Sequence, residues 1–263
     1  MSAPRQVTGL AAVALAPNPG PMTLEGTNTW ILRAPGEEGC VVVDPGPDHD
    51  EHLARVAAAG PVRAILLTHG HSDHSAGAAV LHALTGAWVR ALDPAHRLGS
   101  EGLAAGDVVA EAGVELRVLA TPGHTADSLS FVLHGDGEPP AVLTGDTILG
   151  RGTTVVAHPD GRLDDYLASL RLLRELGDMA VLPGHGPELP AAGRAAEAYL
   201  AHRANRLEQV AAALAELGRT ADQVSPGDVV RLVYADVDRA LWPAAELSVR
   251  AQLDYLSTYL RTH

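Results

Sequence analysis

A short loop that is dense in metal-binding side chains constrains this chain more than any other feature. Residues 64–68 form an apolar run ending in Thr, which is typical of a buried strand, and apolar residues follow at helical spacing from residue 77 onward. Imidazole nitrogens and carboxylate oxygens bind transition metals. The loop between the two predicted elements carries four such side chains, His69, His71, Asp73 and His74. The first two can reach one ion together, while the other two are displaced along the turn toward a second ion.

Three further turns offer one more ligand each. In each of them an apolar run leads into a Gly-containing turn, and a single His or Asp follows. Because glycine allows the backbone to turn sharply, the strand ends can converge on one pocket. The ligands are His124 after residues 118–123, Asp146 after 141–145 and His185 after 180–184. The seven side chains are enough for two ions about 3.5 to 4 Å apart, with a water or hydroxide between them.

Four motifs, taken in order, resemble the metallo-β-lactamase superfamily. They are His-x-His-x-Asp-His at residues 69–74, Pro-Gly-His-Thr at 122–125, Thr-Gly-Asp at 144–146 and Pro-Gly-His-Gly at 183–186. The ordered set is far more specific than any one motif. The resemblance implies that one ion is held by His69, His71 and His124, that the other is held by Asp73, His74 and His185, and that Asp146 bridges them. The alternative is that these are loop histidines satisfied by hydrogen bonds, which would suit a single motif better than the complete set.

Strand and helix patterns alternate over the same part of the chain. Strands are predicted at residues 10–15, 29–32, 40–43 and 114–119, and helices at 50–59 and 163–176. Together with the resemblance, this alternation predicts an α/β fold, the four-layer αββα sandwich, with the site at one edge of the sheets. Cys40, the only cysteine, is predicted to be a small buried strand residue rather than a nucleophile.

The character of the chain changes at about residue 195, where strand signals and ligand candidates both stop. Helical apolar spacing follows, and Ser225-Pro226 combines a helix cap with Pro at the first helical position. We therefore predict a catalytic domain at residues 1–194 and a small helical, winged-helix-like domain at 195–263. Residues 18–30, followed by this tail, are similar to the β-lactamase-like proteins with a C-terminal winged-helix-like domain. That subgroup includes a single-strand endoribonuclease and thioesterases acting on carrier-bound polyketides.

The composition and net charge of the chain limit the reactions and partners that such a site can have. The 263 residues carry a net charge of −13, and all 19 basic residues are Arg. The lack of Lys excludes Schiff-base chemistry, and the acidic charge argues against broad attraction to nucleic acid, although a local Arg-lined groove stays open. No apolar run reaches the length of a membrane span, and the N-terminal segment lacks the pattern of a secretory signal. We expect a cytoplasmic protein with no membrane partner, and the oligomeric state is left open.

The expected cofactor is Zn²⁺, two per chain, with Fe or Mn as alternatives. The expected reaction is hydrolysis of an ester-like bond, a thioester or a phosphodiester, by a metal-bridging hydroxide. The substrate is then a small-molecule or carrier-bound ester or thioester, or single-stranded RNA. Asp73 and Asp146 offset part of the ionic charge, and Asp146 also orients the nucleophile. His158 is the candidate proton donor for the leaving group, the alternative being a surface-loop histidine before Pro159.

Supporting residues and rival functions remain as alternatives. The resemblance implies that Asp44 supports the metal loop from outside and that Thr27 and Asn28 lie near the pocket; the alternatives are a turn-initiating Asp and hairpin-stabilising residues.

Glyoxalase II-like thioester hydrolysis uses the same ligands, but the tail shows no basic cluster to clamp glutathione. β-Lactam hydrolysis is disfavoured, because lactamases usually carry Cys or Ser at the bridging Asp position. A mononuclear iron persulfide dioxygenase and a metal-bound binding protein with vestigial catalysis are hypotheses of other classes, and the complete ligand set favours a two-metal hydrolase over both.

Overall fold

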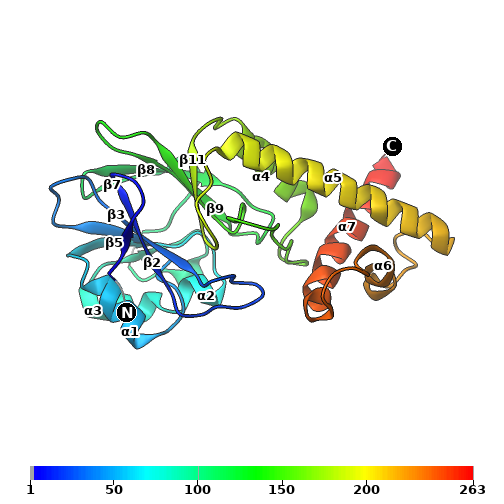
Figure 1. Cartoon of the computed structure of the whole chain (residues 1–263), viewed down its shortest axis with the longest axis horizontal. Helices are drawn as coiled ribbons and strands as arrows, with labels where there is room; N and C mark the ends of the chain where they lie inside the picture. Colours follow the sequence, from blue (N-terminus) through cyan, green and yellow to red (C-terminus); the bar gives the residue numbers. More distant parts are fainter. Residues whose placement is uncertain (1–2, 100, 263) are drawn as a thin grey trace.

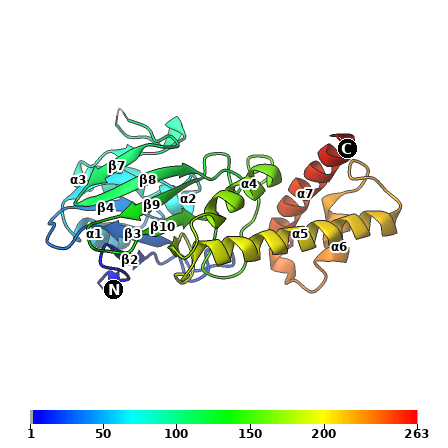
Figure 2. The same ribbon diagram turned by 90° about the horizontal axis from the view of Figure 1, so that it is seen from above.

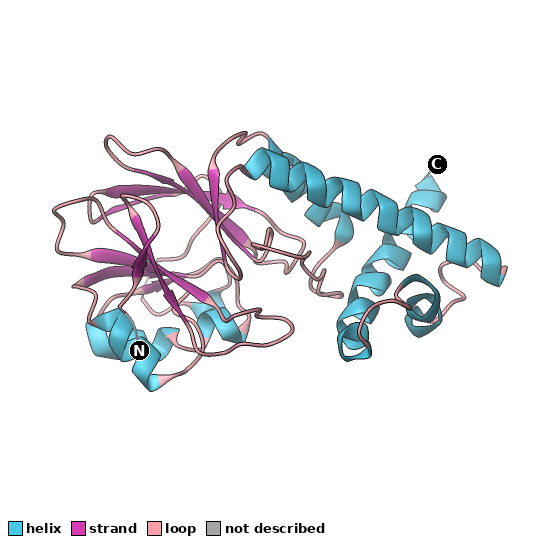
Figure 3. Ribbon diagram, in the orientation of Figure 1, coloured by secondary structure: helices cyan, strands magenta, loops and turns pink. Residues whose placement is uncertain are grey.

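The computed structural model describes residues 3–99 and 101–262, without the side chains of 259–262. Two β-sheets pack face to face, with helices on both outer faces (Figure 1 and Figure 3). A long helix then leads away from the second sheet to a group of helices at the C-terminal end of the molecule (Figure 2). The predicted four-layer sandwich with a helical C-terminal domain is confirmed.

The first sheet contains the strands of the N-terminal half. In spatial order it runs β1 (Arg5–Gln6), β2 (Ala11–Leu15), β3 (Asn28–Leu32), β4 (Cys40–Val43), β5 (Val62–Leu66) and β6 (Val89–Arg90). The first four strands are antiparallel, and β5 and β6 continue parallel to β4. The outer face is covered by α1 (Asp50–Ala57) and α3 (Ala78–Thr85), while α2 (Ser72–Ser75) lies in the loop after β5.

Strand β4 shows why the sequence pattern is uniformly apolar here. Val41 and Val43 face the second sheet, whereas Cys40 and Val42 pack against the helices of the outer face. Because both faces of this strand are buried, its sequence does not alternate between apolar and polar residues. The prediction that Cys40 is a buried strand residue is therefore confirmed, and burial raises the pKa of its thiol.

The second sheet is built from the C-terminal half of the sandwich. Its spatial order is β11 (Ala180–Pro183), β10 (Ala141–Gly145), β9 (Leu129–His134), β8 (Val114–Ala120) and β7 (Val108–Glu111). All pairs are antiparallel except β10 with β11. Strands β8, β10 and β11 consequently point the same way, so that the turns after them lie at one edge of the sheet. Helices α4 (Leu163–Arg174) and the first half of α5 (Ala192–Leu217) cover its outer face.

The C-terminal helices form a core of their own. The second half of α5 packs against α6 (Pro226–Val233) and α7 (Trp242–Thr262), and the Ser225 hydroxyl accepts a hydrogen bond from the Asp228 amide as the helix cap. Short 3-10 helices, η1 (Pro94–His96) and η2 (Arg239–Leu241), complete the elements. Because α5 starts at Ala192, the predicted division between residues 194 and 195 falls in its first turn, and that boundary stays a prediction. Within the described residues, no helix is both long and apolar enough to cross a membrane.

A buried histidine joins α1 to the first sheet. His52 is fully buried, its Nε2 lies 2.9 Å from Thr29 Oγ1, and its Nδ1 accepts a hydrogen bond from Arg55 at 2.7 Å. Burial and the adjacent Arg55 charge lower the pKa of His52 to about 4. Folded His52 is therefore neutral between about pH 4 and 6.5, where the unfolded chain would bind a proton, so acidification through this window favours unfolding.

We predict that His52→Gln reduces the dependence of folding stability on pH. The wild type should lose up to roughly 3 kcal/mol from this residue as the pH falls from about 6.5 to 4, and the variant should not. Urea unfolding of both proteins at about pH 7 and about pH 5 measures the effect. The stability difference between them should shrink at the lower pH, and a difference that is independent of pH would contradict this assignment.

Candidate metal centre

The predicted ligands converge at one edge of the sandwich, between the two sheets. The loop after β5 and helix α2 carry His69, His71, Asp73 and His74; the turns after β8, β10 and β11 carry His124, Asp146 and His185. Five of the seven side chains are buried, and the partly exposed His71 and Asp73 mark the open side. All seven belong to three groups of three residues that share members. Within each group, the possible ligand atoms lie within 4.8 Å of one another.

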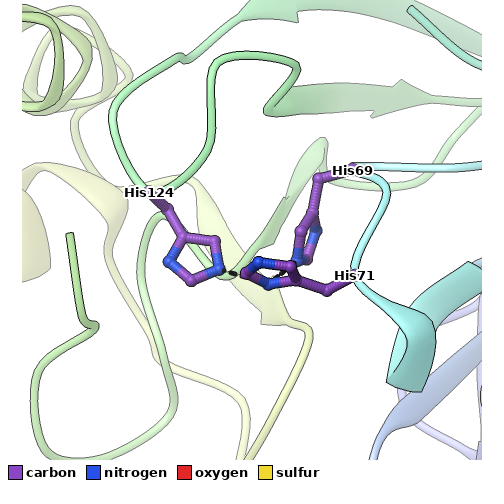
Figure 4. Close-up of side chains that lie close together, drawn as sticks. All are labelled: His69, His71 and His124. Carbon is purple, nitrogen blue, oxygen red and sulfur yellow. Dashed lines mark hydrogen bonds between the residues drawn. The ribbon is translucent and has the colours of Figure 1, made fainter. Parts of the chain in front are cut away.

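The first trio consists of three imidazoles. His69 Nε2 lies 3.1 Å from His71 Nδ1, and His124 Nε2 lies 3.0 Å from the same atom (Figure 4). Nitrogen ligands about 2.0 to 2.1 Å from a tetrahedral ion stand roughly 3.3 Å apart. Both distances therefore fit ligands of a common cation.

The second trio combines a carboxylate with two imidazoles. His185 Nε2 lies 3.1 Å from both Asp73 Oδ2 and His74 Nε2. Asp146 lies between the trios: its Oδ1 is 3.4 Å from His74 Nε2, and its Oδ2 is 3.4 Å from His185 Nε2 and 3.7 Å from His124 Nε2. The Asp146 carboxylate thus faces both groups, as the bridging role requires.

Hydrogen bonds to the imidazole nitrogens that point away from the centre decide which nitrogens are available as metal ligands. The Nδ1 atoms of His124, His185 and His74 lie 2.6, 3.1 and 2.8 Å from Val155 O, Gly26 O and Asp44 Oδ2. Carbonyl and carboxylate oxygens only accept, so each Nδ1 carries a proton, and in the neutral ring Nε2 is the bare nitrogen that faces the centre. His74 Nε2 and His185 Nε2 face each other across 3.1 Å, so two neutral rings would direct their lone pairs at each other.

Two observations show that the centre suits cations. Facing lone pairs repel one another unless a positive charge, a proton or a metal ion, lies between them. Asp146 Oδ1 is also buried, and the described residues give it no hydrogen-bond partner. A buried carboxylate oxygen without a donor is costly. A pair of metal ions bound by the two trios would satisfy both conditions at once.

The pKa directions agree with a site that balances positive charge. Burial opposes ionisation of Asp146, yet His74 and His185 hold its pKa well below the usual range. Burial also opposes charge on His185, but Asp146 and Asp73 raise its pKa to about 9. His69, by contrast, has its pKa lowered by burial and by neighbouring imidazoles. The carboxylates therefore supply the negative charge on the side of the second trio.

Asp44 connects the two trios from outside. Its Oδ2 accepts from His74 Nδ1 and, at 2.7 Å, from the Thr68 hydroxyl, while its Oδ1 accepts from the Thr68 amide at 2.8 Å. Because the Thr68 proton points to Asp44, Thr68 Oγ1 can accept from His69 Nδ1, 3.0 Å away. One buried carboxylate thus orients a ligand of each trio, and Asp44 adopts a positive φ of 53° to do so. The structure places Asp44 where the resemblance implied.

The start of β3 braces the turn that carries His185. Asn28 Nδ2 donates to Pro183 O at 3.0 Å and to Gly186 O at 2.8 Å, and Thr27 pairs with His185 in an isolated bridge. Asn28 reaches this turn through its side-chain amide and Thr27 through its backbone, so both residues lie beside the site. The two alternatives for them, a place near the pocket and a role in fixing a turn, are therefore compatible.

A cavity of about 310 Å³ opens on His124 and Asp146 and extends between the sandwich and the C-terminal helices. Its walls include apolar side chains and the basic residues His202, Arg203 and Arg206 of α5. We expected no basic cluster in the tail that would clamp glutathione, and α5 places these three basic residues on one wall of the cavity. Their spacing in the sequence was a signal that could have shown it. His158 is half-buried and lies outside the three ligand groups, so its role stays a prediction.

Comparisons with known proteins agree with the fold. The family model described as "Metallo-beta-lactamase superfamily" matches residues 22–185, and "Beta-lactamase associated winged helix domain" matches 225–258. The chain is 32% identical to "Beta-lactamase-like protein 2 homolog" of Caenorhabditis elegans, covering 92% of this chain and 82% of that protein. It is 34% identical to "Atrochrysone carboxyl ACP thioesterase" of Aspergillus fumigatus, covering 78% of this chain and 65% of that protein. A crystal structure of a "Beta-lactamase domain protein from Burkholderia ambifaria" superposes with a TM-score of 0.79 at 22% identity, covering 97% and 88% of the two chains.

We predict that Asp44→Asn weakens metal binding without unfolding the protein. The amide keeps the size of the carboxylate and tolerates the positive φ, but its NH₂ group would face a donor on Thr68 or His74. Affinity should fall by roughly 10- to 100-fold, the usual cost of losing such a supporting group. Competition with a chromophoric chelator measures it, with the exposed Asp48→Asn as control. Equal affinity in Asp44→Asn and wild type would contradict this role.

Gly184 provides a second test that substitutes none of the seven ligands. A Cβ at this position would lie 2.6 Å from Asp146 Oδ1 and 2.7 Å from His74 Cε1. Gly184→Ala should therefore displace both side chains and lower metal affinity. In the control Gly227→Ala, the new Cβ would approach side-chain ends no closer than 3.3 Å. Unchanged metal affinity in Gly184→Ala would show that the centre does not need this close approach.

Proposed function

Because the chain belongs to the metallo-β-lactamase superfamily, we propose that it is a two-metal hydrolase that cleaves the thioester bond of a carrier-bound acyl group. The hydrolase fold and a His/Asp cluster suited to a binuclear centre are its general properties. The observation that carries the proposal is the position of Asp146, which faces both trios and also lines the cavity. A substrate in that cavity reaches the centre directly.

The residues of this chain have separate roles in the proposed hydrolysis. When bound, a pair of divalent ions would lower the pKa of a shared water and polarise the oxygen under attack. His69, His71 and His124 would hold one ion, and Asp73, His74 and His185 the other. Asp146 Oδ1, which has no donor among the described residues, can accept a hydrogen bond from the attacking water and orient it. Zn²⁺ is the metal we propose because three neutral imidazoles suit it, with Fe or Mn to be distinguished by elemental analysis.

The choice of a thioester rests on the relatives and the cavity. A relative that is 34% identical is named as a thioesterase acting on an acyl carrier protein. The cavity beside Asp146 has apolar walls formed in part by Leu149, Val237 and Leu241, which suit an acyl group better than a strongly charged strand of RNA. The net charge of −13 also disfavours a long polyanion. His158 remains our proposed donor of a proton to the leaving group.

We predict that Asp146→Ala abolishes hydrolysis. Because the substitution removes the carboxylate that faces both trios, activity should fall by roughly 100-fold or more, and the bound metal should fall below two ions per chain. Asp178→Ala, which removes an exposed carboxylate outside the site, is the control.

The assay offers acyl thioesters on a carrier protein, oxygen esters and single-stranded RNA. Wild type is expected to prefer the thioesters. Preferred cleavage of RNA would overturn the substrate proposal, and undiminished hydrolysis by Asp146→Ala would overturn the site.

A further inference from the structure

We propose that helix α5 supplies a cationic clamp, made by Arg203 and Arg206, for an anionic group of the substrate in the cavity beside the metal centre. The inference rests on the proposed function, because it concerns the substrate of the same site. It assigns to the C-terminal helices a direct part in substrate recognition.

Arg203 is a buried cation without a carboxylate partner. Its side chain is only 3% exposed, and within the described residues it makes no ion pair and its Nε has no hydrogen-bond partner. One Nη donates to Thr154 O, and the guanidinium lies 5.2 Å from the ring centre of Tyr166. The aromatic face offsets part of the cost of burial, but a buried charge usually needs a counter-ion. An anionic ligand in the cavity would provide one.

Arg206 stands one helical turn further along the same wall. It stacks on Tyr234 at 4.5 Å and donates to Gln209 Oε1 at 2.7 Å and to Val233 O at 3.1 Å. All three partners are neutral, so the guanidinium is fixed in place while its charge is not cancelled. Burial and the two neighbouring guanidiniums lower the pKa of His202, as expected where the local potential is positive.

The charge of the cavity contrasts with that of the whole chain. The protein carries −13 overall, yet three Arg and a single acid, Asp146, line this cavity. Arg151 is paired with Glu25, whereas Arg203 and Arg206 are not paired with an acid within the described residues. Apolar residues complete the walls. The cavity therefore suits a substrate that combines an apolar acyl part with one anionic group, a phosphate on the thiol arm or a carboxylate on the acyl chain.

Matched thioesters distinguish the two sources of the anion. Butyryl and glutaryl thioesters of pantetheine and of phosphopantetheine differ only in the carboxylate and the phosphate. For the wild type we expect kcat/KM to rise on the order of 10-fold when the recognised anion is present. Arg206→Met should lose that gain, mostly through KM, so that its kcat/KM no longer differs between the neutral and the anionic thioesters. Arg194→Met, on an exposed position of α5, should keep the gain.

Direct binding separates this inference from the proposed function. Calorimetry with phosphopantetheine and with glutarate should show one of them binding the wild type on the order of 10-fold more tightly than it binds Arg206→Met or Arg203→Met. Binding of this kind without thioester turnover would refute the thioesterase and retain the clamp. Thioester turnover that is indifferent to both anions, or that falls equally for all four substrates in Arg206→Met, would overturn the clamp.

Discussion

The structure depends on imidazole nitrogens that face one another and need a positive charge, a proton or a metal ion, between them. Val155 O, Gly26 O and Asp44 each accept from the outer nitrogen of a ring, which turns the inner nitrogens of His124, His185 and His74 toward the centre. Such an arrangement is stable only around positive charge. The acceptors come from both halves of the chain, so the tautomers, the metal centre and the packing of the two sheets depend on one another.

The sandwich explains how distant turns reach one place. Strands β8, β10 and β11 run in the same direction in the second sheet, and β5 brings the histidine loop to the same edge from the first. Asn28 and Trp30 of β3 both donate to Pro183 O, which ties the first sheet to the turn that carries His185. Helix α5 then joins the second sheet to the C-terminal helices and carries Arg203 to the wall of the cavity.

Local signals in the sequence predicted the ligand turns well, because each ligand follows an apolar run and a Gly-containing turn. These signals did not reveal β9. Its residues are buried from Leu129 to Leu133, and a short strand that is buried on both faces shows no alternation of polar and apolar residues that would identify it. The start of α5 at Ala192 was not predicted, because the alanines of its first turns give little contrast between faces. The basic wall of the cavity was also missed: the spacing of Arg203 and Arg206 indicates a shared helix face, but the place of that face beside the metal centre follows only from the packing of α5 against the loop at residues 151–155. Asp44 could be proposed from resemblance, but its contacts to both trios required the fold.

Anomalous diffraction from crystals of the metal-loaded protein tests the central claim most directly. Two peaks are predicted between the sheets, one bonded to His69, His71 and His124, the other to Asp73, His74 and His185, with the Asp146 carboxylate between them. A single peak, or ions bound away from these side chains, would contradict the account of why the imidazoles face one another.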